Sequence, residues 1–480
     1  MAEEKGYELR VTEDGMKACV TVDSDAPSFS DVSSAVVDEA AQRGLEGVPS
    51  AEKLTSLFSE AYEKNGEVRD VAICSGTAPT PPQDGQIVWA RDFFSTDFVK
   101  DEYGRVNYHE RKGNPSVYQG EWIATVYPAK EGTGGVDVCG GIVPPKHPKE
   151  VSLKAGNQVT VESEGGEGEA EADVYHYYAA IDGRVHYDND TLDVHEEFVV
   201  KSDVGKKTGD ISHPGSVIVK GDVTPGSSVE TEGDLEVDGT IEQADVAAGG
   251  NLEVKEGITG KGKSPIRAGG MVTARYIREA EVEAEGQVSA VNEIISSDVY
   301  TRGKADLSEG RLAGGELTAL QGAKIKELGS EGASVTTLKV AIDPFLEKRI
   351  APLQEEIDKN QGQIDKIYQK AGPQLRNQKN LSAKQREAVT ELLGKITELE
   401  TAIEEAREKI KKVKQESEEK ARQGATHIEG TIFPESYIQV DDTPLERIAE
   451  KWHGPIRLTK VPDEDAGGHK IELIHEGEAK

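Results

Sequence analysis

The sequence predicts a multidomain α+β protein: an N-terminal α/β region, then a right-handed parallel β-solenoid (a β-helix) that carries an inserted antiparallel coiled-coil hairpin. Three observations lead to this prediction. A short glycine-anchored repeat runs from Val217 to Leu317, heptad periodicity begins abruptly after residue 341, and strand-like sequence returns after Gly424. We therefore divide the 480 residues into 1–208, 209–340, 341–424 and 425–480. A chain of this length accommodates several domains with separate cores.

The N-terminal region begins with a predicted β-hairpin, residues 7–11 and 18–22, which turns at Asp14-Gly15. Two helices should follow. Ser28 or Ser30 would cap the first, which contains residues 35–41 and ends at Gly44. The second covers 51–62 and stops at Asn65-Gly66, after which the sequence turns β-like with many Gly and Pro turns.

The repeat has an apolar residue, a glycine four positions later, and a second apolar residue two positions after that. Alternation within a copy, as in Leu235 and Val237, predicts strands, and the glycine marks the bend between them. The sixth copy has Ala305 in its last apolar position, and the seventh has Arg311 in its first. The seven anchoring glycines are Gly221, Gly233, Gly250, Gly270, Gly286, Gly303 and Gly315. One copy cannot bury its apolar face alone, so neighbouring copies must stack as a solenoid.

The glycine spacing distinguishes between two kinds of solenoid. Successive glycines are 12, 17, 20, 16, 17 and 12 residues apart. Left-handed hexapeptide solenoids, such as those of acyltransferases, need coils in multiples of six residues. The irregular spacing favours a right-handed β-helix.

Two heptad seams follow the repeat, and a polar stretch at Gly372-Pro373 to Ser382 separates them. The simplest structure is an antiparallel helical hairpin; an intermolecular coiled coil is the alternative. Asn360 in a core position would set register at some cost in stability. The first seam contains Leu346, Ile350, Leu353, Ile357, Asn360, Ile364, Ile367 and Ala371. The second contains Val389, Leu392, Ile396, Leu399, Ile403, Ala406, Ile410 and Val413.

The composition excludes several classes of partner. A net charge of −33 argues against binding nucleic acid or an anionic membrane surface, because both require a basic surface. The charge itself has two open explanations, solubility or a high-salt environment. Cys19, Cys74 and Cys139 form no C-x-x-C pair, so we expect no disulfide framework. The first ten residues lack an apolar signal segment, and no apolar run is long enough for a membrane helix, so we expect a cytoplasmic protein.

Residues 257–264 match the phosphate-binding P-loop pattern, with Lys263 and Ser264 in the final positions. A P-loop also requires a helix directly afterwards, whose N-terminus faces the phosphate. Here Pro265 follows, and then the next solenoid repeat starts at Ile266. We therefore interpret this segment as a basic turn between solenoid strands.

Residues 186–195 gather carboxylates and two imidazoles, His186 and His195. The segment lacks the glycine of a calcium loop and the histidine spacing of a zinc site on a strand. We interpret it as a hairpin turning at 188–190, and the acidic stretch 162–173 as a solvated loop, with docking of a basic partner as the alternative. The sequence contains no recognisable catalytic, cofactor-binding or metal-ligating residues, so we expect no enzyme.

Several phrases resemble the flagellar assembly protein A (FapA) family over roughly residues 5–440. They are Val11–Ala18, Arg43-Gly44-Leu45, Gln119–Ala124, Gly132–Gly140, Ala179–Val185, Gly221-Asp-Val, Gly233–Gly239 and the heptad insertion after Asp343-Pro344. The resemblance implies a non-enzymatic cytoplasmic scaffold, linked to flagellar assembly or polar organisation through protein–protein binding. It also implies protein partners: flagellar or polar proteins, or the glucose-specific component of the phosphotransfer system.

Two alternatives of other classes remain open at this stage. The first is a polymer-forming cytoskeletal solenoid similar to bactofilins, in which solenoid ends would stack into filaments. The second is an enzyme, either a carbohydrate-active β-helix or a nucleotide-dependent protein that uses residues 257–264.

Overall fold

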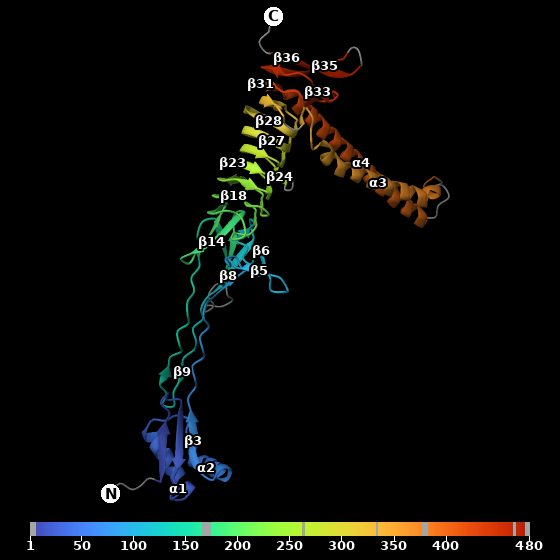
Figure 1. Ribbon diagram of the computed structural model, residues 1–480. Helices are drawn as coiled ribbons and strands as arrows, with labels where there is room; N and C mark the ends of the chain where they lie inside the picture. The colour runs from blue at the N-terminus through green and yellow to red at the C-terminus, as the bar shows by residue number, and fades with distance from the viewer. Residues whose placement is uncertain are drawn as a thin grey trace. The chain divides into compact units, whose positions relative to one another are not determined.

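The computed structural model describes residues 6–165, 174–261, 265–332, 335–376, 383–463 and 467–475 (Figure 1). The chain forms two compact units. The first contains Met1–Arg91, Gly120–Ala180 and Tyr187–Asp193, and the second contains Asp92–Gln119, Ile181–His186 and Val194–Lys480. Across the described ranges, no helix combines the length and apolarity that crossing a bilayer requires.

The first unit opens with a three-stranded antiparallel sheet and two helices, which confirms the predicted hairpin and both predicted helices. The sheet has the order β1-β2-β3, and the elements are β1 (Tyr7–Val11), β2 (Lys17–Val22), α1 (Phe29–Gln42), α2 (Ala51–Asn65) and β3 (Val68–Ser75). Ser28 is the N-cap of α1, because its side-chain oxygen accepts a hydrogen bond from the Asp31 amide at 3.3 Å. Gly66 ends α2 in the left-handed conformation, with φ of 77°. Val20, Val36, Leu54 and Phe58 are fully buried between sheet and helices.

The rest of the N-terminal region is β structure. An antiparallel sheet has the order β12-β13-β8-β4, formed by β4 (Gln86–Trp89), β8 (Trp122–Tyr127), β12 (Val159–Glu164) and β13 (Val174–Ala179). The other strands of this region are β5 (Phe98–Lys100), β6 (Val106–Arg111), β7 (Ser116–Val117), β9 (Gly135–Val136), β10 (Ile142–Val143), β11 (Lys154–Ala155), β14 (Gly183–Asp188) and β15 (Thr191–His195). Of the acidic stretch, residues 162–165 are exposed, and 166–173 lie outside the described residues.

The second unit contains a parallel β-solenoid of about eight turns, which confirms the predicted architecture (Figure 1). Its handedness stays a prediction. Its strands are β16 (Glu197–Val200), β17 (Ile211–His213), β18 (Ser216–Val219), β19 (Ser228–Thr231), β20 (Leu235–Val237), β21 (Ile241–Glu242), β22 (Asp245–Ala248), β23 (Leu252–Thr259), β24 (Pro265–Ala268), β25 (Val272–Arg278), β26 (Glu281–Ala284), β27 (Val288–Thr301), β28 (Ala305–Ala319), β29 (Ala323–Leu328), β30 (Thr336–Val340), β31 (Thr426–Ile432) and β32 (Ser436–Val440). The first strand begins at Glu197, upstream of the boundary expected at 209, because β16 already pairs in parallel with β18.

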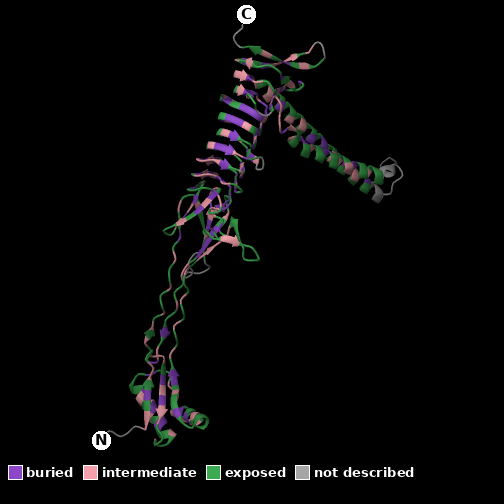
Figure 2. Cartoon of the chain, viewed as in Figure 1, coloured by how far each residue is buried: buried purple, intermediate pink, exposed green. Residues whose placement is uncertain are grey.

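Three faces make up each turn, and apolar residues in equivalent positions stack inside. Face A follows β16, β18 and β20, face B follows β17, β19 and β22, and face C runs through Val204, Val223 and β21. On face C one fully buried column contains Val204, Val223, Ile241, Ile258, Ile277, Ile294, Leu312, Leu328 and Ile432. Full burial of one such side chain contributes about 1.5–3 kcal/mol. Figure 2 shows the buried positions concentrated in these strands.

Five of the repeat glycines, Gly233 to Gly303, stack at the corner where the chain passes from face B to face A, which we call the glycine corner. The backbone amides form a ladder there: Gly250 donates to Gly233 O at 2.9 Å, and Gly270 donates to Gly250 O at 2.8 Å. A Cβ atom on Gly286 would lie 2.7 Å from the carbonyl carbon of Gly270, so close backbone approach requires glycine. Gly221 and Gly315 belong to other corners, next to Val223 of face C and in β28 opposite Ser297 and Thr336. The first and seventh copies are therefore out of register with the other five, because each turn has three corners.

Helices α3 (Leu346–Arg376) and α4 (Ala383–Gln423) form an antiparallel pair within one chain, which confirms the predicted hairpin over the intermolecular alternative (Figure 1). Ile357, Ile364, Ile403 and Ala406 are buried between the helices. Asn360 is half-buried in the same seam. The heptad interpretation is therefore confirmed in the described part of the pair; residues 377–382, between the helices, lie outside it.

Both ends of the solenoid are covered within the second unit. At the C-terminal end, β33 (Glu446–Ile448) pairs antiparallel with β32, while β34 (Trp452–His453) and β35 (Ile456–Pro462) pair antiparallel with β31, and β36 (His469–His475) pairs with β35. The Glu446 carboxylate accepts a hydrogen bond from the Ile471 amide at 3.2 Å, so one amide of β36 is bonded to the β33 strand.

The N-terminal end of the solenoid is covered by the segment that contains β5, β6 and β7. Arg111 donates to the carbonyl oxygens of Thr208 and Lys207, each at 2.6 Å, and the Ser116 hydroxyl donates to Ser212 O at 3.1 Å. His213 is buried beneath this segment, and burial lowers its pKa. These contacts place the segment against the first turn of the solenoid.

Candidate functional site at the root of the helix pair

Of the two motifs that suggested ligand chemistry, residues 186–195 form the predicted hairpin, whereas the turn predicted within 257–264 falls largely outside the described residues. Gly257 and Thr259 lie in β23, and the next element after the P-loop-like segment is strand β24 rather than a helix. Lys263 and Ser264 lie outside the described residues. Residues 186–195 form the β14–β15 hairpin, with Asn189 and Asp190 at positive φ in its turn. In the described ranges, no group of three or more His, Cys, Asp and Glu side chains is placed to hold a metal ion.

The feature with the most concentrated chemistry is the root of the helix pair. The pair is inserted at the glycine corner of the last turn, between Val340 on face B and Thr426 on face A. Gly424 rejoins the stack directly on Gln321, and a Cβ atom there would lie 2.5 Å from the Gln321 carbonyl carbon. The insertion thus replaces a short corner without interrupting the parallel pairing of β28 to β30 and β30 to β32.

Arg302 is the centre of an ion cluster at this root. It stands at the glycine corner, only 7% of its side chain is exposed, and it binds three carboxylates from three elements. Its distances are 2.8 Å to Glu285 on the preceding turn, 3.1 Å to Asp343 before α3, and 3.0 Å to Glu416 near the end of α4. One guanidinium therefore ties the solenoid to both helices.

Asp343 is the most buried member of the cluster, with no exposed side-chain surface. Its Oδ1 accepts a hydrogen bond from the Phe345 amide at 3.0 Å, and its Oδ2 lies 3.6 Å from Arg349. Arg349 also binds Glu416 at 3.0 Å. A buried carboxylate needs such partners, because removal from water costs several kcal/mol when no cation compensates.

The cluster shifts the ionisation of its members. Hydrogen bonds from Arg349 and Arg302 lower the pKa of Glu416 to about 2. Burial alone would lower the pKa of Arg302, but hydrogen bonds to Glu285 and Glu416 and the charge of Asp343 raise it overall. Both groups therefore stay charged at neutral pH. The ion cluster of Arg302, Glu285, Asp343, Arg349 and Glu416 holds the helices to the solenoid by charge, and we call it the electrostatic lock.

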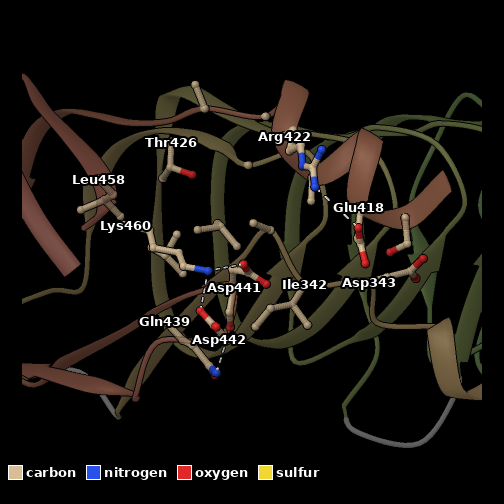
Figure 3. A pocket seen from close by; sticks show the side chains of 18 of the residues that line it. Ile342, Asp343, Glu418, Arg422, Thr426, Gln439, Asp441, Asp442, Leu458 and Lys460 are labelled. Carbon is tan, nitrogen blue, oxygen red and sulfur yellow. Dashed lines mark hydrogen bonds and ion pairs between the residues drawn. The ribbon is translucent and has the colours of Figure 1, made fainter. Parts of the chain in front are cut away.

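An open cavity of about 890 Å³ lies beside the lock (Figure 3). Its walls come from the corner that leads into α3, the last turns of α4, the end of β32 and the middle of β35. Lys460 points at Asp441 and Asp442, at 2.7 and 2.6 Å, and Arg422 points at Glu418, 3.6 Å away (Figure 3). Ile342, Leu346 and Leu458 add apolar surface.

Sequence analysis did not identify Arg302, although a signal was present. The residue directly before the stacked glycine is Glu232, Gly249, Gly269 and Glu285 in the first four copies at the glycine corner. In the fifth copy this residue is Arg302, a cation where the others are acidic or neutral. Asp343 precedes the heptads directly, as part of Asp343-Pro344. The pairing of these two residues depends on where the helix pair inserts, which no local pattern specifies.

The fold and the root together define a capped β-solenoid protein with an inserted, electrostatically anchored helix pair. The model of the Flagellar Assembly Protein A beta solenoid domain matches residues 196–464, and the model of the Flagellar Assembly Protein A N-terminal region matches residues 7–190. The chain belongs to this family, as the resemblance predicted. Comparisons with curated proteins and with solved structures give no significant match.

Proposed function

We propose that this protein is a non-enzymatic scaffold of flagellar assembly or polar organisation, in which the solenoid is a platform and the helix pair is the arm that binds partner proteins. The observation that carries the proposal is the anchoring of the helix pair through buried Arg302 and Asp343. An anchored arm keeps a bound partner at a constant position relative to the platform. Family membership supplies the link to flagellar assembly.

The distribution of charge supports the arm as the binding segment. Residues 346–423 contain 17 Lys and Arg against 15 Asp and Glu, whereas the whole chain contains 56 against 89. The helix pair is therefore nearly neutral, and the acidic excess lies elsewhere. Proteins that meet the helix pair experience less long-range repulsion than at other surfaces. Partners implied by the family resemblance, flagellar or polar proteins or a phosphotransfer component, remain candidates.

The covered solenoid ends weigh against the filament alternative. Stacking of solenoids end to end requires open faces at both ends, whereas β33 to β36 cover one end and residues around Arg111 and Ser116 cover the other. Among the described residues, the element that follows the P-loop-like segment is strand β24 rather than the helix that nucleotide binding requires, which gives the nucleotide-dependent alternative no support. The scaffold is the function that these features support best.

Co-purification from the native cells tests the proposal. The intact chain is compared with a variant in which residues 341–425 are replaced by a copy of the corner Leu320–Gly322, combined with Arg302→Gln to avoid an unpaired buried guanidinium. We expect the variant to keep its β signal in circular dichroism. The amount of flagellar-assembly proteins that co-purify with it should be at least about tenfold lower than with the intact chain. Equal recovery of those proteins by both forms would place binding outside the helix pair.

A further inference from the structure

We propose that the cavity beside the root of the helix pair binds a small anion that carries carboxylate or phosphate groups. This inference concerns a different site from the partner-binding arm and does not depend on the proposed function. The cavity volume of about 890 Å³ lies in the range of pockets that hold small molecules. The walls combine apolar side chains with charged ones, as such pockets usually do.

The charges around the cavity favour an anion. Each of the four carboxylates in its walls is already in an ion pair: Asp343 with Arg302, Glu418 with Arg422, and Asp441 and Asp442 with Lys460. Lys414 and Arg457 also line the cavity, and neither forms an ion pair with any residue that the structure describes. Lys414 and Arg457 are thus the cavity-lining cations whose charge no described carboxylate compensates, whereas Arg422 and Lys460 are already paired.

The two cations come from different elements. Lys414 is on α4, and Arg457 is on β35, which pairs with β31 of the last solenoid turn. An anion that contacts both would connect the helix pair to the C-terminal strands. Hydrogen bonds between ionised partners are among the stronger ones in proteins. Binding should therefore also slow amide exchange in residues 414–426 and 456–460.

Isothermal titration calorimetry of the full chain with citrate and with inorganic phosphate, at constant ionic strength, tests the site. We expect at least one probe to bind with a Kd below about 1 mM. Lys414→Gln and Arg457→Gln should each weaken binding by about tenfold, which corresponds to one charged hydrogen bond. Lys412→Gln is the matched control, since Lys412 is exposed on the same helix, does not line the cavity, and its loss changes the net charge equally.

Two results would overturn the inference. One is the absence of heat with either probe while the chain remains folded by circular dichroism. The other is equal weakening by the control and the two cavity variants, which would indicate nonspecific attraction. If the Gln variants lose the fold, Lys414→Arg and Arg457→Lys replace them: retained binding supports the site, and loss of binding with an intact fold contradicts it.

Discussion

At the residue scale, the backbone approaches the stacked glycines of the glycine corner so closely that no side chain fits at these five positions. Gly286 and Gly394 make a matched pair for testing this, because a Cβ atom on Gly286 would meet backbone at 2.7 Å, whereas one on Gly394 would meet nothing within 4 Å. We expect Gly286→Ala to destabilise the solenoid by about 1–3 kcal/mol through overpacking. Gly394→Ala should stabilise α4 by up to about 1 kcal/mol. Chemical unfolding followed by circular dichroism measures both; equal effects would contradict the backbone stacking.

Arg302 is the second residue with a large predicted effect. Arg302→Met leaves Arg349, at the longer distance, as the cation beside buried Asp343, and loss of one partner of a buried ion pair costs about 3–5 kcal/mol. The control is Arg275→Met, because Arg275 pairs with Glu256 at the surface with about half of its side chain exposed, and such pairs contribute about 0–1 kcal/mol. Hydrogen exchange of amides 342–350 and 412–424 measures the effect. Unchanged exchange in the Arg302 variant would show that the lock does not hold the helices.

The pKa of Glu416 predicts a pH dependence of the same lock. Its pKa falls from an ordinary value of 4.5 to about 2 in the folded chain, so the folded state favours the ionised form. The resulting stability is present above pH 4.5 and is lost as the pH falls toward 2. Thermal unfolding between these pH values should show a smaller acid-induced decrease for Glu416→Gln than for the parent chain. An identical pH profile for both forms would contradict the assigned ion pairs.

At the element scale, the sequence was sufficient to predict each type of element but not how the elements are combined. The heptad pattern predicted α3 and α4, and Ser28 and Gly66 correctly marked helix ends, because caps and periodicity are local properties. The five stacked glycines were also recognised from their spacing. Gly221 and Gly315 also lie at corners, but at different ones from the other five, because a three-cornered turn offers three similar positions for glycine and a linear motif does not tell them apart.

The half-buried Asn360 in the seam of the helix pair gives a prediction for this element. A polar residue in such a seam sets register at a cost in stability, so Asn360→Leu should raise the melting temperature of the helical signal. Circular dichroism at 222 nm, where helices dominate the signal, measures the change. Asn360→Gln keeps the polar group and is the control, with no expected increase. A lower melting temperature for the Leu variant would indicate that Asn360 makes a stabilising contact.

At the scale of the whole molecule, the second unit is a solenoid with covered ends and one insertion. The solenoid, the hairpin insertion and the return of the chain could be predicted because repeat length, heptads and strand alternation are written in the sequence. The candidate site could not, since Arg302, Asp343 and Glu416 are far apart in the chain and meet only at the last turn. The same holds for the cavity, whose walls come from five separate segments between Gly322 and Lys460.

The covered ends distinguish the scaffold account from the cytoskeletal alternative, and sedimentation velocity at several protein concentrations tests that distinction most directly. We predict one species whose mass does not change over a hundredfold range of concentration, because β33, β34 and β35 already pair with β31 and β32, where a strand of another solenoid would have to add. A mass that grows continuously with concentration, with filaments visible by electron microscopy, would contradict the account and favour the cytoskeletal alternative.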